Sequence, residues 1–234
     1  MESRKLLKNG KPRGKLTKKD ITKMSVLSFL EQASFSFERM QAPGFTLSML
    51  PAAEKIFGDS KEDMAEFMTY NMEFINTEPH MATFLMGLIL SMEEHGEDRK
   101  LIEGIRNGLF GPFAGLGDAI FWFTVLPISA AICCSLAQDG SILGPLLYIG
   151  IWIVAAISRI WFGSFGYKLG VKAVSTISEG TTVQSVFDGI LPNMLPLAIV
   201  FLIYWLFKKK NAKVLVIILG IILFGILMSF LGWM

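Results

Sequence analysis

Polar side chains that can hydrogen-bond a ligand recur in the first half of this chain, between short apolar runs. The segment from Glu31 to Gln41 carries two glutamates, two glutamines and an arginine where the chain becomes apolar. Ionisable groups at membrane depth usually mark a pathway or a binding site. Amides and carboxylates offer the donors and acceptors that hydroxyl groups need, so they would suit a neutral ligand with many hydroxyls. The candidate contacts are Gln32, Glu38, Arg39, Asn76, Thr77 and Asp118.

A purely structural role for these residues is the alternative. Glu38 and Arg39 would then pair with other buried charges and hold helices together. The nearby aromatic residues would either cover the apolar face of a sugar or face lipid and core. These aromatic residues are Phe35, Phe37, Phe121 and Trp122.

Catalytic motifs are absent in any specific form. The sequence has no glycine-rich phosphate loop ending in Lys-Ser/Thr, no metal-binding spacing of histidine and cysteine, and no nucleophile elbow. His80 and His95 are its two histidines, and both are expected in a loop or on a helix surface. We therefore expect no metal, no cofactor and no enzymatic chemistry. A membrane enzyme that uses Glu93, Glu94 or His95 as acid or base has the weakest support.

Four apolar stretches occur further along the chain, each near the roughly 20 residues that a helix needs to cross a membrane. They are Ala119–Ala137, Ile142–Phe162, Ile190–Phe207 and Val214–Trp233. Hydrophobic residues make up 52% of the chain, and charge is concentrated in the first hundred positions rather than spread over a soluble surface. The sequence therefore predicts an all-α, polytopic membrane protein with about four clear transmembrane helices.

A basic tail, residues 1–16, precedes the membrane domain, residues 17–234. Lysines and arginines next to the first membrane segment hold that end of a chain in the cytoplasm, so we expect a cytoplasmic N-terminus. No apolar run follows the first positive charges within twenty residues, as a signal peptide would require. The charge of the tail needs no nucleic-acid partner to explain it.

The N-terminal half should contain helices that are re-entrant or broken rather than simple spans. The capping-box spacing of Thr17 and Asp20 predicts a helix over residues 18–37. Gly44 and Pro51 should interrupt the next segment of the chain, because the apolar piece between them is too short to span a membrane.

Two further short helices and a helix break are expected before the first clear span. Ser60 should begin an amphipathic helix, and the apolar piece Met81–Leu90 covers only about half a membrane thickness. The charged residues 93–100 should form a solvated turn. Five glycines and a proline in Gly104–Asp118 predict a broken helix that lines a cavity, with its final carboxylate at the lip. Close packing against another helix is the alternative explanation for these glycines.

A resemblance to a known family rests on four runs of residues. The runs are Gln32–Gln41, Glu73–Pro79, Gly108–Trp122 and Gly166–Gly170. In this order they resemble the IID component of the mannose/fructose/sorbose family of sugar phosphotransferase systems (PTS). The resemblance covers residues 16–178 and 182–233, nearly everything beyond the basic tail.

The resemblance implies a function. A IID component joins a IIC membrane subunit to form the sugar-conducting unit, while cytoplasmic IIA and IIB subunits relay phosphate from phosphoenolpyruvate onto the incoming sugar. We therefore expect a transport subunit, not an enzyme, in a hetero-oligomer of the bacterial cytoplasmic membrane, with a mannose-type hexose bound at the six candidate contacts. A second hypothesis is a short IID-like docking or receptor protein that assembles with IIC without conducting sugar.

A departure from the family and an inconsistency of charge fall at the same place. Family members continue after the Gly166–Gly170 run with another hydrophobic helix, whereas here residues 178–184 come almost at once. Lys168 and Lys172 belong on the cytoplasmic side with the tail. The lysines of residues 208–213 also belong on the cytoplasmic side. Only one apolar span separates the two groups of lysines, and a single crossing would place them on opposite sides of the membrane. The sequence thus predicts a missing crossing between about Lys172 and Val183.

Overall fold

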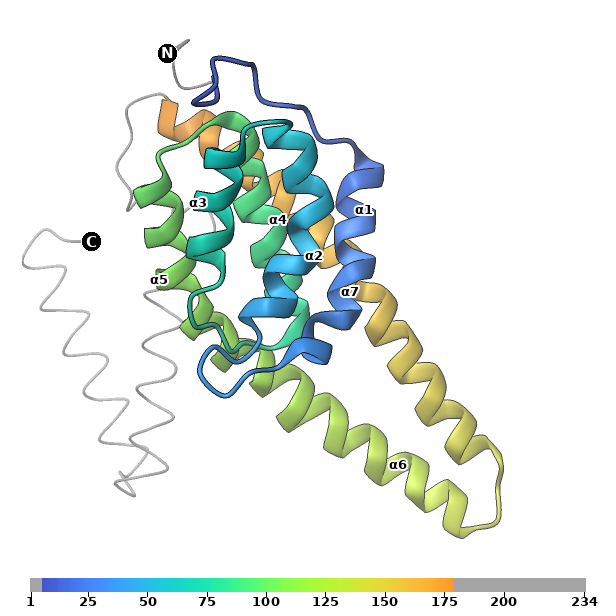
Figure 1. The fold of residues 1–234 in the computed structure, drawn as a ribbon. Coiled ribbons are helices and arrows are strands. Elements are labelled where there is room, and N and C mark those ends of the chain that lie inside the picture. Colours follow the sequence, from blue (N-terminus) through green and yellow to red (C-terminus); the bar gives the residue numbers. More distant parts are fainter. Residues whose placement is uncertain (1–5, 179–234) are drawn as a thin grey trace, which may run out of the picture. The chain divides into compact units, whose positions relative to one another are not determined.

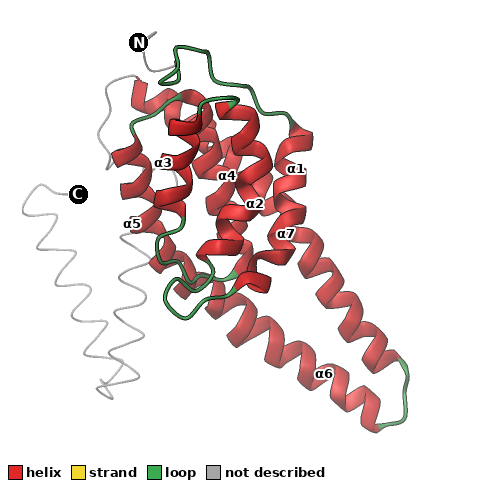
Figure 2. Ribbon diagram, viewed as in Figure 1, coloured by secondary structure: helices red, strands yellow, loops and turns green. Residues whose placement is uncertain are grey.

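The computed structural model describes residues 6–178 of the 234-residue chain. Its regular elements are all helical within this part, as Figure 2 shows, which confirms the predicted all-α class. A bundle of α1 to α5 and the second half of α7 carries a projecting hairpin made of α6 and the first half of α7 (Figure 1). The elements are α1 (Lys18–Leu27), the 3₁₀ segment η2 (Ser28–Ser34), α2 (Ala42–Phe57), α3 (Lys61–Asn71), α4 (Pro79–His95), α5 (Arg99–Gly117), the π-helical segment η3 (Asp118–Val125), α6 (Leu126–Gln138) and α7 (Leu143–Ser178).

Helix α4 is the core of the bundle. Its residues 79–93 are all buried, and it packs against α2, α5 and α7. The Glu78 carboxylate caps its first turn by accepting two backbone N–H hydrogen bonds. Gly96, in the left-handed conformation with φ 71°, ends the helix. The short apolar piece expected at residues 81–90 is therefore the middle of a core helix.

Glycines bring α7 into backbone contact with α4. A side chain at Gly166 would collide with the carbonyl oxygen of Phe84, and one at Gly170 would collide with the hydroxyl of Ser91. The contact is mutual, because a side chain at Gly87 of α4 would collide with the backbone of α7. The spacing of the two α7 glycines, which end the Gly-Tyr-Lys-Leu-Gly run, thus serves close helix packing.

Two helical stretches of the described chain, Arg99–Gln138 and Leu143–Ser175, are long and apolar enough to cross a membrane. Only 17% and 6% of their most apolar windows are buried, so both present apolar side chains outward. Gly144 lets the two arms of the hairpin approach, because a side chain there would collide with the carbonyl oxygen of Cys133. The first two predicted spans are thus helices, and both helices extend beyond the predicted limits.

The helix breaks predicted at glycine and proline are wrong. Helix α2 runs through Gly44 and Pro51, and α5 runs through Pro112 to Gly117. An apolar stripe on each helix packs into the bundle and outweighs the local penalties of about 1 kcal/mol for glycine and about 3 kcal/mol for proline. The stripes comprise Phe45, Met49, Ala52 and Ile56 in α2, and Ile102, Ile105, Leu109 and Phe113 in α5.

The helix changes from α to π geometry at Asp118, where the break predicted over Gly104–Asp118 was expected to end. Segment η3 begins at Asp118 with wider π turns before the chain continues as α6. Its Thr124 hydroxyl donates a hydrogen bond to the Ala119 carbonyl, five residues earlier, at 2.7 Å. Because π segments are rare and often occur at functional sites, this one draws attention to Asp118 and its neighbours.

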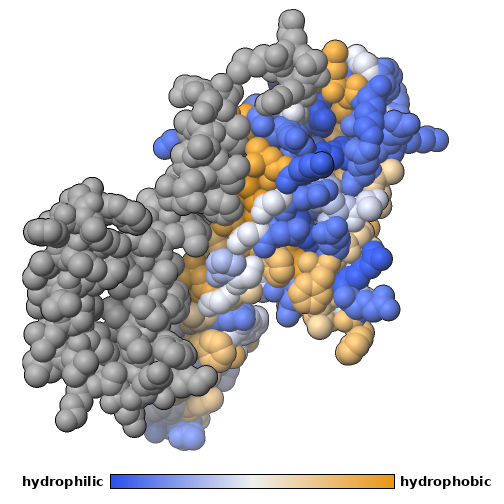
Figure 3. All heavy atoms as spheres, turned by 90° about the vertical axis from the view of Figure 1, so that its left-hand side faces the viewer, coloured by the Kyte–Doolittle hydropathy of each residue, from blue (hydrophilic) through white to orange (hydrophobic). Residues whose placement is uncertain are grey.

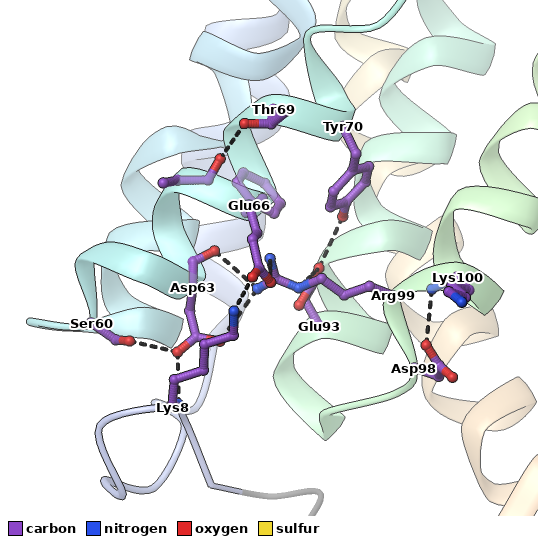
Figure 4. Close-up of polar contacts among 12 residues, drawn as sticks. Lys8, Ser60, Asp63, Glu66, Thr69, Tyr70, Glu93, Asp98, Arg99 and Lys100 are labelled. Carbon is purple, nitrogen blue, oxygen red and sulfur yellow. Dashed lines mark hydrogen bonds and ion pairs between the residues drawn. The ribbon is translucent and has the colours of Figure 1, made fainter.

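A buried ion cluster joins α3, α4 and α5 at one end of the bundle (Figure 4). The Glu93 carboxylate is fully buried and accepts hydrogen bonds from Tyr70 at 3.0 Å and from Arg13 at 3.3 Å. Arg99 lies between this carboxylate, at 3.7 Å, and that of Glu66, at 2.9 Å. The predicted solvated turn is therefore wrong for Glu93, because α4 directs this residue into the bundle, where two hydrogen-bond donors and the Arg99 cation compensate its burial.

The part of the N-terminal segment that the structure describes lies against the bundle. The guanidinium groups of Arg13 and Arg99 both lie over the Phe57 ring, each 5.5 Å from the ring centre. The backbone N–H of Gly14 donates to the Ile56 carbonyl at 2.9 Å. Residues 6–16 are thus part of the tertiary structure as well as carriers of positive charge.

Exposed apolar side chains gather on particular elements. On the face drawn in Figure 3, hydrophilic residues cover much of the bundle, with apolar patches between them. Large exposed apolar side chains occur on η2, on the loop after it and on the hairpin. They include Leu30, Phe35, Phe37, Ile132, Val154 and Trp161. The predicted spans Ile190–Phe207 and Val214–Trp233, and residues 179–183 of the predicted missing crossing, lie outside the described residues.

Replacing Gly166 by alanine should destabilise the protein by about 2–3 kcal/mol, because the new methyl group meets backbone atoms of α4 that cannot move aside. The matched control is Gly150→Ala on the same helix, where a side chain meets nothing within 4 Å among the described residues. That change should alter stability by about 1 kcal/mol or less. Thermal unfolding of the purified variants in detergent makes the comparison. Equal melting temperatures for the two variants would refute the contact.

Candidate functional site

A polar cavity of about 260 Å³ opens where η2, the linker between α3 and α4, and the start of η3 meet. Its volume is near the lower end of small-molecule pockets, which span roughly 300–1,000 Å³, so it suits a small ligand. The lining residues come from parts of the chain that are far apart in sequence. They are Gln32, Gln41, Asn76, Thr77, Pro79, Asp118 and Trp122.

Gln41 joins two walls of this cavity. Its side-chain oxygen accepts a hydrogen bond from the backbone N–H of Thr77 at 2.9 Å. The backbone N–H of Gln41 donates to the Ile75 carbonyl at 3.0 Å. The preceding residue, Met40, closes the loop after η2 in the left-handed conformation with φ 51°, which is uncommon for a residue other than glycine. The polar run after η2 and the linker are therefore held in one register.

Arg106 fixes the linker from the side of α5. Its side chain is 1% exposed and donates to the Glu73 carbonyl at 2.8 Å and to the side-chain oxygen of Asn107 at 2.8 Å. The guanidinium also lies over the Phe45 ring, 6.0 Å from its centre. Asn76, three residues along the linker, is thus carried by backbone that is tied down on both sides.

Two glycines let the backbones around the cavity approach each other. A side chain at Gly44 would collide with the backbone of Glu31, and one at Gly117 would collide with the side chain of Glu78. These contacts seat η2 on α2, and the start of η3 on the start of α4. One of the glycines before Asp118 therefore serves packing within this chain. The glycines of α5 whose added side chain would meet nothing within 4 Å among the described residues are Gly104, Gly111 and Gly115.

Buried polar atoms without a protein partner lie in or beside the cavity. The Thr77 hydroxyl and both carboxyl oxygens of Glu31 have no hydrogen-bond partner among the described residues. Burial raises the pKa of Glu31 to about 8, against the opposing charge of Arg159, so this carboxyl is protonated at neutral pH. Each unsatisfied buried group costs about 1–3 kcal/mol, which water or a ligand can recover.

Four of the six predicted contacts meet in the cavity, namely Gln32, Asn76, Thr77 and Asp118, together with the predicted aromatic residue Trp122. The other two lie elsewhere. Arg39 is exposed, lines a separate hollow of about 500 Å³ beside α3, and donates to the Met72 carbonyl at 3.4 Å. Glu38 is exposed and lines neither of these two hollows.

Two residues that matter here were not among the predicted contacts: Gln41, which lines the cavity, and His80, which lies next to the lining residue Pro79. Gln41 belongs to the polar run that the sequence singled out, but its buried position comes from the loop closed at Met40. His80 was predicted in a loop or on a helix surface, and that prediction is wrong. It is 3% exposed and stacks on Phe121 with 3.8 Å between ring centres. The missed signal was the apolar helix that begins at Pro79, because a helix buried on all sides also buries its second residue.

The family comparison decides the identity. The model of the PTS system mannose/fructose/sorbose family IID component matches residues 15–186 and 178–234. The chain belongs to the IID component family. The mannose-specific EIID component of Escherichia coli (strain K12) is 32% identical, with 91% of this chain and 93% of that one aligned. The fructose permease IID component of Bacillus subtilis (strain 168) is also 32% identical, with 94% and 98% aligned.

A solved relative has the same fold as this IID component. A chain in the cryo-EM structure of the mannose transporter ManYZ in complex with microcin E492 superposes with a TM-score of 0.66 at 33% identity, with 94% of this chain and 98% of that chain covered. The IID component is a permease component of the PTS, so this chain is a membrane transport subunit.

The runs that carry the resemblance to IID components have distinct places in the structure. Three of them, Gln32–Gln41, Glu73–Pro79 and Gly108–Trp122, each contribute residues to the lining of the cavity. The fourth, Gly166–Gly170, packs α7 against α4. The family model matches as two segments, and their junction at residues 178–186 overlaps the place of the predicted missing crossing.

Replacing Gln41 by alanine should loosen the linker, because the buried N–H of Thr77 loses its acceptor at a cost of about 1–3 kcal/mol. Hydrogen–deuterium exchange should rise in the peptide that contains Thr77. The matched control is Gln32→Ala, which removes an exposed amide from the same cavity and should leave the exchange unchanged. Unchanged exchange in Gln41→Ala would show that this hydrogen bond does not hold the linker.

Proposed function

We propose that this IID component forms, with a IIC partner, the sugar-conducting unit of a phosphoenolpyruvate-dependent PTS, and that a mannose-type hexose binds in the polar cavity. The observation that carries the proposal is the convergence of Gln32, Asn76, Thr77 and Asp118 on one small cavity. Phosphate transfer to the sugar belongs to the cytoplasmic IIA and IIB subunits. The relatives named for mannose and fructose support the hexose class.

The chemistry of the cavity suits a sugar. The amides of Gln32 and Asn76 can both donate and accept, the Asp118 carboxylate accepts, and Trp122 offers a flat apolar surface to the ring face. Each hydrogen bond replaces one made to water and therefore contributes only about 0.5–1.5 kcal/mol. A wrongly placed hydroxyl that leaves a buried group unpaired costs about 1–3 kcal/mol, so modest affinity is compatible with discrimination among hexoses.

Replacing Asn76 by alanine should raise KM for D-mannose uptake about 2- to 13-fold, the equivalent of one lost hydrogen bond. Asp118→Ala should raise KM about tenfold or more, because hydrogen bonds to charged groups are stronger. Uptake is measured in cells that express each variant with IIC, IIA and IIB, and co-purification with IIC reports assembly. Glu38→Ala and Asp139→Ala change exposed carboxylates away from the cavity and should transport normally. Normal uptake by both cavity variants would refute the site.

The docking hypothesis is favoured by one observation, the interruption of the family pattern at residues 178–186. In this second function the chain assembles with IIC and serves as a receptor without conducting sugar. The ManYZ relative, solved with microcin E492, gives this role a precedent. Cells whose single IID copy is this chain separate the two functions: sugar uptake supports the permease, and an assembled complex without uptake supports docking.

The basic end of the bundle faces the cytoplasm in this proposal. Three basic segments meet there, because Arg13 pairs with Glu93 near the end of α4, Arg99 begins α5, and Tyr167, next to Lys168 of α7, donates to Glu94. Cytoplasmic segments of membrane proteins carry an excess of lysine and arginine. The cytoplasmic N-terminus is consistent with the same arrangement.

Cysteine labelling tests this orientation in a background without Cys133 and Cys134. A cysteine replacing Lys168 should react with a membrane-impermeant maleimide only from the cytoplasmic face. Ile142 is 75% exposed and lies in the turn between α6 and α7. A cysteine that replaces it should react only from the outer face. Labelling of both positions from one face would contradict the two crossings.

A further inference from the structure

His80 lies beside the cavity without lining it. Its ring is parallel to that of Phe121, at 2° between planes and 3.8 Å between centres. Phe121 belongs to η3 and lies between Asp118 and Trp122, the two residues by which η3 lines the cavity. Contacts that fix the His80 ring therefore also fix the turn of η3 that presents these two side chains.

Both nitrogens of the His80 ring face acceptors. Nδ1 lies 2.6 Å from a carboxyl oxygen of Glu78, and Nε2 lies 2.7 Å from the backbone carbonyl oxygen of Ala155 in α7. A carbonyl oxygen only accepts hydrogen bonds, so Nε2 carries a hydrogen. A second hydrogen must lie between Nδ1 and the carboxyl group, because two lone pairs at this distance would repel each other. Hydrogen bonds on both nitrogens thus hold the ring in one orientation.

Few charged groups of residues 6–178 lie near the pair of His80 and Glu78. The second carboxyl oxygen of Glu78 accepts backbone N–H hydrogen bonds at the start of α4. Arg159 of α7 and Asp118 of η3 lie within electrostatic range of Glu78. Glu31 of η2, also in range, is protonated at neutral pH. The Arg159 cation compensates the carboxylates around the pair.

We propose that His80 is a positioning residue for sugar binding, which holds η3 in the turn that presents Asp118 and Trp122 to the cavity. The inference rests on the proposed sugar site. The ring ties three elements together: it stands on α4, donates to α7 and stacks on η3. Without its hydrogen bonds to Ala155 and Glu78 the ring loses this position, and sugar affinity falls.

The experiment measures the Kd of the purified IIC–IID complex for D-mannose in lipid nanodiscs at neutral pH. His80→Phe keeps a flat ring against Phe121 but removes both ring nitrogens. We expect its Kd to be about tenfold weaker, which corresponds to about 1.4 kcal/mol. His80→Gln keeps a side-chain N–H that can donate to the Ala155 carbonyl, so it should recover part of the affinity, and both variants should still co-purify with IIC.

A matched control isolates His80. His95→Phe changes the other histidine, whose Nδ1 lies 2.7 Å from the Ser91 carbonyl oxygen at the far end of α4, and it should keep the wild-type Kd.

A His80→Phe variant with wild-type affinity would overturn the proposal. If His80→Phe fails to assemble, Phe121→Leu decides the matter, because it removes the ring on which His80 stacks. A weakened Kd in Phe121→Leu supports the proposal, and a wild-type Kd overturns it. Failure of the sugar site itself is distinguishable, because Asn76→Ala and Asp118→Ala would then bind D-mannose normally. Weakened binding in those two variants with an unaffected His80→Phe would leave the cavity standing and remove His80 from its role.

Discussion

The close contact between α4 and α7 is the constraint on which the other features depend. Because glycines replace side chains on both helices, the two backbones lie against each other, and the pairs Gly166 with Phe84 and Gly170 with Ser91 set their register. In this register the helices run in the same direction. It places Ala155 of α7 next to the start of α4, where its carbonyl oxygen reaches His80. The same contact fixes where the apolar hairpin leaves the bundle, beside the polar cavity.

The two ends of α4 show how similar chemical groups serve different purposes. At one end the buried Glu93 carboxylate has a phenol and two guanidinium groups as partners, so its charge is compensated and the cluster holds α3, α5 and the N-terminal segment together. At the other end the Thr77 hydroxyl and the Glu31 carboxyl lack partners among the described residues. Water or a ligand can supply the missing hydrogen bonds, and this second end of the core helix is where we propose the sugar site.

The family motifs serve either the cavity or the packing of the bundle. Three of the four runs converge on the cavity, although they lie on η2 with the loop after it, on the linker before α4, and on the α5–η3 helix. The run Gly108–Trp122 lines the cavity with Asp118 and Trp122, both of which belong to the π segment. This segment begins at Asp118, within the long helix that continues into the hairpin. The permease component therefore combines an apolar hairpin with a bundle that places the polar residues of the cavity at the base of that hairpin.

The sequence by itself determined the helical class, the first two apolar helices, the family and four of the cavity residues. Each of these depends on composition, on periodicity or on polar residues concentrated in a short run, which are local properties. Tertiary structure decided the rest. Packing of apolar stripes kept α2 and α5 continuous through Pro51 and Pro112, where local propensity predicted breaks. Burial of Glu93 and His80 depended on partners up to 80 residues away along the chain, and no local pattern encodes such distant contacts. Arg39 and Glu38 share the run of Gln32 and Gln41, yet a loop closed at Met40 separates them from the cavity, because the direction of a side chain in a loop is set by the backbone it packs against.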